Sequence, residues 1–193
     1  MKTKHLLPAL AVVALAIVGC LPSVQPLYTD KDLIFKKELV GAWGEGESDS
    51  PDEDRWKFSR DDSARYKLEM RDSDGRKGEM YAHLVSLKSG LYLDLQPDPE
   101  FLEKKAADWY QFALVQGHVF FKIHKIGEKE LKMSMTDYDW LGDYLETNPQ
   151  SLAHYKQEDR LVLTATTAEL QAFIAKHDDK FWDEPAKMIR QKD

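Results

Sequence analysis

Residues 64–71, ARYKLEMR, decide the fold of this chain. Every second residue from Ala64 to Met70 is apolar or aromatic, and the residues between them are charged. Successive side chains of a strand point to opposite faces, so this alternation predicts a half-buried strand of an antiparallel sheet. The stretch RDSDGRKG follows, and its Asp74-Gly75 pair is a hairpin signal.

Further strands are predicted on both sides of this hairpin. They are separated by turn residues such as Ser89-Gly90 and Gly127. We expect seven or eight strands, a meander that curls into a barrel or half-barrel. The segments are ELVGAWGE (38–45), RWKFS (55–59), residues 78–87, LYLDL (91–95), HVFFKIHKIG (118–127), KELKMSMT (129–136) and RLVLTA (160–165).

Three short helices flank the predicted sheet. They are expected in PEFLEKKAADW (99–109), DWLGDYLETNP (139–149) and TTAELQAFIAKH (166–177). In the last of these, Thr166 and Glu169 have the spacing of a capping box. We expect this C-terminal helix to pack on the sheet and the polar tail after Trp182 to fray. The predicted fold class is therefore mainly β with flanking helices (β or α+β).

The N-terminus predicts an export signal over residues 1–19. A positive start, MKTKH, precedes thirteen apolar residues from Leu6 to Val18. A membrane-spanning helix needs about 20 apolar residues, so this run is too short to span and suits a secretory signal peptide. The sequence Ile17-Val18-Gly19-Cys20 then ends the run.

These four residues resemble the lipobox of bacterial lipoproteins. The resemblance implies cleavage between Gly19 and Cys20, acylation of the Cys20 thiol, and the lipid bilayer as a partner through that acyl group. Cys20 is the only cysteine of the chain, so acylation removes its one free thiol. Because Leu21, and not aspartate, follows the cysteine, family analogy favours the outer membrane, with the protein facing the periplasm.

The domain organisation follows from this assignment. Residues 20–32, which include Pro22 and Pro26, are expected to be the lipidated cysteine and an extended tether. Residues 33–193 are expected to form a single β-rich domain. The formal net charge of −7 argues against nucleic acid as a partner, because that needs a basic footprint.

Nothing in the sequence predicts catalysis, a metal site or a cofactor. No pair of histidines after residue 20 has metal-ligand spacing on one helix, and the motifs of serine hydrolases, nucleotide-binding loops and zinc proteases are absent. We therefore expect no enzyme activity, no metal and no cofactor.

Two tripeptides give a second family resemblance. Gly41-x-Trp43 lies on the first predicted strand of the meander, and Thr136-Asp137-Tyr138 follows a late one. Together they resemble lipocalins. The resemblance implies an eight-stranded barrel that holds a small apolar ligand, with Trp43 packed at the closed end against an arginine, here Arg160. A helix over residues 139–146, before the last strand, departs from the lipocalin pattern.

Two functional hypotheses follow. The first is a lipid-anchored cell-envelope lipoprotein whose curled sheet encloses a pocket for a small apolar ligand. The alternative is a protein–protein interaction module at the envelope, such as an accessory subunit or an inhibitor. The short tether and the acidic surface favour the alternative, and the strand meander and its aromatic content favour the first.

Overall fold

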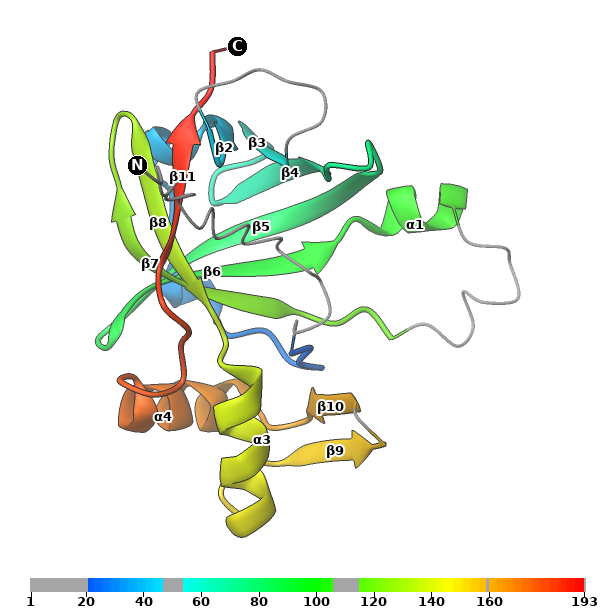
Figure 1. Ribbon diagram of the computed structural model, residues 1–193, viewed down its shortest axis with the longest axis vertical. Helices are drawn as coiled ribbons and strands as arrows, with labels where there is room; N and C mark the ends of the chain where they lie inside the picture. Colours follow the sequence, from blue (N-terminus) through cyan, green and yellow to red (C-terminus); the bar gives the residue numbers. More distant parts are fainter. Residues whose placement is uncertain (1–20, 47–53, 106–114, 159, 193) are drawn as a thin grey trace, which may run out of the picture.

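A closed antiparallel barrel of eight strands forms the body of the protein (Figure 1). The computed structural model describes residues 21–46, 54–105, 115–158 and 160–192. The strands pair in the order β5-β4-β3-β2-β11-β8-β7-β6, and β6 pairs with β5 to close the ring. Their bounds are β2 (Gly41–Gly44), β3 (Arg55–Arg60), β4 (Arg65–Arg71), β5 (Lys77–Leu87), β6 (Gly90–Pro97), β7 (Val119–Ile126), β8 (Glu130–Met135) and β11 (Ala186–Arg190).

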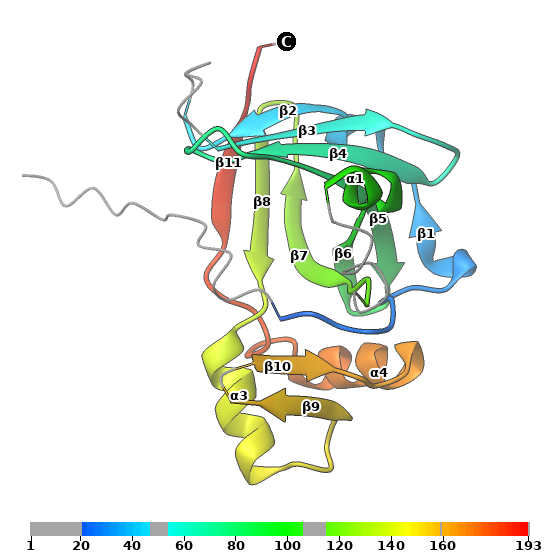
Figure 2. The same ribbon diagram turned by 90° about the vertical axis from the view of Figure 1, so that its right-hand side faces the viewer.

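A smaller layer packs against the outer wall of the barrel, below it in Figures 1 and 2. It consists of α3 (Tyr138–Thr147), α4 (Thr167–His177) and a two-stranded sheet of β9 (His154–Gln157) and β10 (Arg160–Leu163). The remaining elements are η2 (Asp30–Asp32), β1 (Leu33–Ile34), η3 (Lys37–Leu39) and α1 (Pro99–Lys105). The strand β1 pairs with the end of β5 that β4 does not reach.

The two layers enclose two separate hydrophobic cores. One fills the barrel and contains the inward side chains of its strands, among them Trp43, Trp56 and Tyr66. The other lies between the outer wall of the barrel and the small layer, and contains Tyr92, Phe173 and Trp182. The wall formed by β5, β6 and β7 is therefore covered on both faces.

The predicted fold class is confirmed, and local signals explain its elements. On β4, Tyr66 and Leu68 are fully buried, as the alternation predicts. Gly75 has a φ of 76° in the turn to β5, a conformation that glycine adopts without strain. At α4, the Thr166 hydroxyl accepts from the Glu169 amide and the Glu169 side chain accepts from the Thr166 amide, so the capping box is formed. The predicted strand RLVLTA exists as β10, but it lies outside the barrel.

The expectation that the chain frays after Trp182 is wrong, because β11 completes the barrel. Ala186 to Ile189 pair with β8, and Ile189 and Arg190 pair with β2. Met188 is 3% exposed in the barrel core. A five-residue strand with one buried side chain is too short to give a clear alternation, so it is missed in the sequence.

Arg190, and not Arg160, is the arginine that contacts Trp43. Its guanidinium lies 4.2 Å from the Trp43 ring centroid. It also donates to the backbone carbonyls of Val40 at 2.7 Å, Glu38 at 2.5 Å and Glu128 at 2.5 Å. Gly41 has a φ of 128°, and a Cβ there would collide with this guanidinium, so the backbone needs glycine at this position. Arg160 is exposed at the start of β10.

The expectation of an extended tether up to residue 32 is also wrong. Residues 21–29, which we call the strap, lie between the barrel and the small layer (Figure 2, dark blue). Leu21, Ser23 and Leu27 are all at most 2% exposed. Ser23 exchanges two backbone hydrogen bonds of 2.8 Å with His118, and Val24 donates to the Leu163 carbonyl. Leu21 and Leu27 belong to the second core, so this proline-containing segment packs as part of the folded domain.

Replacing Arg190 with alanine should destabilise the barrel. The substitution removes three hydrogen bonds and a cation–π contact, which together should lower the unfolding free energy by about 2–3 kcal/mol. Urea denaturation measures the difference. Arg160→Ala is the matched control and should change the unfolding free energy by less than about 0.5 kcal/mol. Equal losses in the two variants would show that Arg190 does not close the barrel.

Candidate functional site

A buried carboxylate on β6 holds the strap on the barrel wall. Asp94 is fully buried, and its Oδ2 accepts from the Leu27 amide at 2.8 Å. Its Oδ1 lies 2.7 Å from Nδ1 of His118. An ionised carboxylate can only accept, so Nδ1 of His118 carries the proton of this hydrogen bond. Both oxygens of a charge that is costly to bury are thereby satisfied.

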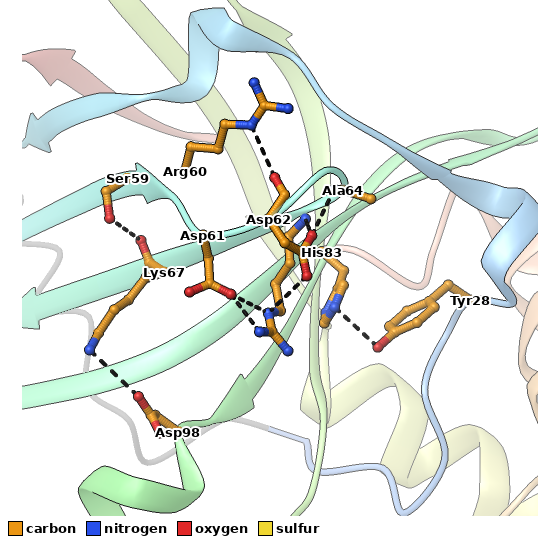
Figure 3. Close-up of polar contacts among 10 residues, drawn as sticks. Tyr28, Ser59, Arg60, Asp61, Asp62, Ala64, Lys67, His83 and Asp98 are labelled. Carbon is orange, nitrogen blue, oxygen red and sulfur yellow. Dashed lines mark hydrogen bonds and ion pairs between the residues drawn. The ribbon is translucent and has the colours of Figure 1, made fainter.

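His83 and Tyr28 extend this polar cluster, and Figure 3 shows the Tyr28 hydroxyl directed at the His83 ring. His83 on β5 lies opposite Asp94 on β6, and the strap brings the Tyr28 hydroxyl to 3.4 Å from Nε2 of His83. Burial, and then the charge of Asp94, raise the pKa of Tyr28 to about 12. Burial lowers the pKa of His83, although Asp94 partly opposes this effect. Among the described residues, no partner hydrogen-bonds the buried Nδ1 of His83.

Arg65 on β4 borders the cluster, but its guanidinium forms its ion pairs with acids outside the cluster. It lies opposite His83 in the sheet, yet its guanidinium forms ion pairs with Asp61 at 2.5 Å and Asp62 at 3.6 Å. It also lies 4.1 Å above the Tyr81 ring centroid. The cluster thus contains an imidazole with a lowered pKa but no activated hydroxyl or thiol, so it can exchange a proton and hold the strap.

The barrel interior is spanned by one aromatic pair. Trp56 on β3 and Phe121 on β7 meet edge to face, with ring centroids 5.4 Å apart. Counted around the ring, β3 and β7 are four strands apart in either direction, so these two residues come from opposite walls. The interior is therefore packed with side chains at this level and is not an open channel.

The two sides of this pair differ. On one side, η3 covers the barrel end, where Nε1 of Trp43 donates to the Leu39 carbonyl at 2.9 Å and both residues are fully buried. On the other side, four half-buried apolar side chains lie at the strand ends nearest the connection from β6 to β7: Met70, Met80, Val119 and Met135. We call this side the methionine end.

An opening exists at the methionine end. Gly78 on β5 lies opposite Met70, which in turn lies opposite Trp56. A Cβ built on Gly78 would have no atom of the described residues within 4 Å. Methionine side chains are flexible and adapt to irregular apolar surfaces. This is therefore the part of the described barrel that can accept an apolar group with least rearrangement.

A hollow of about 260 Å³ lies on the outer wall next to the methionine end. Its charged lining consists of Arg55, Lys57, Glu69, Arg71, Lys77 and Glu79. Arg55, Arg71 and Lys77 stand directly opposite one another on three neighbouring strands. Like charges at such positions repel one another, and Glu69 and Glu79 stand opposite each other in the next row inside the same hollow.

The structure disperses the residues singled out from the sequence. Gly41 and Trp43 lie at the closed end of the barrel with Arg190. Thr136 follows β8 and forms an isolated bridge to Trp182, and the Asp137 side chain caps α3 by accepting from the Trp140 amide at 2.8 Å. Tyr138 is the first residue of α3. These three residues and Arg160 therefore do not share a site with Trp43.

The lipidation and cleavage residues cannot be compared with the structure. Gly19 and Cys20, with the predicted signal peptide of residues 1–19, lie outside the described residues. In the part of the chain that is described, no helix has the length and apolarity to cross a membrane. Within that same part, no three His, Cys, Asp or Glu side chains are grouped as they would be around a metal ion.

The polar cluster under the strap was missed in the sequence. Its one signal is Asp94 within LYLDL, an acid in an otherwise apolar strand. Alternation places Asp94 on the outer face, where an acid is normally solvated. Residues 21–29 pack over this face, and this packing buries the carboxylate.

Comparison with known proteins adds one weak similarity. No family model matches the sequence, and no curated protein matches it. A solved structure of a lipocalin-like protein from Bacteroides uniformis is similar with a TM-score of 0.29 and 20% identity, over 50% of this chain and 88% of that chain. The barrel architecture follows from the strand order itself.

The stability of the protein should fall below pH 6.5, partly through His83. Because the pKa of His83 is lowered in the folded state, the unfolded chain takes up a proton first as the pH falls, which favours unfolding. The charged and titratable groups that act on it are Tyr28, Asp62, Arg65, Asp94 and His118. In His83→Gln, the unfolding free energy measured by urea between pH 7 and 5 should fall less steeply than in the wild type. Identical slopes would mean that His83 does not titrate with folding.

Proposed function

We propose that this chain is a lipid-anchored protein of the cell envelope, held by an acylated Cys20 at the outer membrane and facing the periplasm. The lipobox resemblance supports the anchor. Leu21, the residue after Cys20, is 2% exposed and belongs to the second core, so the predicted mature chain begins where the folded domain begins. We propose a binding role without catalysis, since the described polar cluster offers no activated nucleophile.

The proposed ligand is a small apolar molecule that enters the barrel at the methionine end. The observation that carries this proposal is the open space at Gly78, beside Met70 and above the Trp56–Phe121 pair. The opposite end is covered by η3, and the aromatic pair fills the middle. A ligand bound here would contact methionine and valine side chains and would lie nearer the rim than the centre of the barrel.

The anchor is tested by metabolic labelling with radioactive palmitate. The wild type should incorporate label and sediment with envelope membranes, whereas Cys20→Ala should do neither, because a thiol is needed to accept the lipid. Two or more acyl chains give stable anchoring, so the wild type should stay with the membranes after a high-salt wash. Equal labelling of the two proteins would refute the anchor.

The ligand site is tested by filling the opening. Gly78→Leu places an apolar side chain in the open space without backbone strain, so the variant should fold but lose the ligand. Native mass spectrometry of gently purified wild type should detect a bound small molecule that the variant lacks. Gly75→Asn, in the exposed turn at the end of the same hairpin, is the control and should retain it. A wild type free of any small molecule, together with a co-purifying protein, would favour the interaction module instead.

A further inference from the structure

The exposed large apolar side chains of the described chain gather on one face. They are Val24, Val115 and Tyr155, with 37%, 74% and 58% of their surface exposed. They come from three separate parts of the sequence: the strap, the segment before β7, and β9. Figure 2 looks onto this region, where the strap runs between the barrel and β10, with β9 beyond it.

The pairing of these segments explains why the three side chains share a face. Ser23 is paired with Leu163 on one side and with His118 on the other, and all three residues are buried. Neighbouring positions of a strand point the opposite way, so Val24 points outward, as does Val162 next to Leu163. Tyr155 on β9 lies opposite Val162.

The segment before β7 joins the same face. A Cβ on Gly117 would lie 3.5 Å from the Cβ of Pro22, so Gly117 packs directly against the strap. Val115 lies two residues before Gly117 and is the most exposed of the three apolar residues. We call the surface formed by Pro22, Val24, Val115, Tyr155 and Val162 the anchor face.

The anchor face is also the place where the acylated residue joins the domain. Cys20 is bonded to Leu21, and consecutive Cα atoms are about 3.8 Å apart. Leu21 is buried in the second core, and Ser23 and Val24 are held by backbone hydrogen bonds. No free linker therefore separates the strap from the acyl group, and the barrel cannot turn away from the membrane as it could on an extended tether.

We infer that the anchor face lies against the lipid bilayer, so that the acyl group and the exposed Val24, Val115 and Tyr155 give the barrel one defined orientation on the membrane. This inference rests on the proposed anchor. Three side chains bury too little apolar surface to bind a bilayer alone, but the anchor holds them at a high effective concentration next to it. Tyrosine is favoured at the headgroup level, where its ring is apolar and its hydroxyl is wet.

Charge on the anchor face is compatible with this position. The chain is acidic overall, and acidic groups are repelled by anionic lipids. At the edge of the anchor face, however, β10 begins with the exposed Arg160, and on β9 Lys156 is paired with Glu146 at 2.5 Å. Arg160 would attract a lipid phosphate, whereas the exposed Glu158 in the turn between β9 and β10 would repel it, so the charges on this edge are mixed.

The orientation is tested with site-specific fluorophores on the full, acylated chain. Val115→Cys, Tyr155→Cys and, as a control in the distant β4–β5 turn, Asp74→Cys each provide one labelling site, because the Cys20 thiol is acylated. The labelled proteins are reconstituted in vesicles of phosphatidylcholine and phosphatidylglycerol that contain brominated lipid. Quenching at positions 115 and 155 should be several-fold stronger than at position 74.

Two comparisons separate the failure of this inference from the failure of the anchor. Palmitate incorporation is measured in the same three proteins, and Cys20→Ala versions of each should show no quenching. Acylated proteins with equal quenching at all three positions would overturn the orientation and leave the anchor intact. Strong protection of positions 115 and 155 from aqueous iodide, without quenching by brominated lipid, would also overturn it, because a second protein molecule would then cover the face.

Discussion

The rest of the structure depends on one buried carboxylate. Asp94 accepts hydrogen bonds from the strap at Leu27 and from His118 at the start of the next strand, and it is fully buried by both. Without the strap, a charged group and several apolar side chains of the barrel wall would face water. With it, the wall becomes the floor of a second core, and the helices α3 and α4 have a surface on which to pack.

Barrel closure depends on a different set of contacts at the other side of the fold. Arg190 reaches three backbone carbonyls and the Trp43 ring, so one side chain joins β11, η3 and the β7–β8 turn. The interior is then packed through the Trp56–Phe121 contact. Closure and packing together leave only the methionine end of the described barrel able to rearrange around a bound ligand. The proposed ligand site therefore lies there.

The sequence predicts the parts of this fold that depend on local pattern. Alternation in β4, the Asp74-Gly75 turn and the capping box of α4 each involve residues close in the chain, and each is confirmed. The strap, the role of Arg190 and the burial of Asp94 depend on contacts between residues more than 60 positions apart. Their residue types carry no local signal: the strap resembles a linker because of its prolines, and β11 resembles a polar tail. The polar cluster under the strap follows from those long-range contacts and was therefore not predicted.

The place of β11 in the ring has a consequence for biogenesis. This strand is the last in chain order, yet it inserts between β2 and β8, so the gap between them stays open until residues 186–190 are available. A polypeptide that emerges from its N-terminus during synthesis cannot close this ring before nearly all of the described barrel sequence is available. Closure is therefore a late step, and the edges of β2 and β8 stay unpaired with each other until the C-terminal strand arrives.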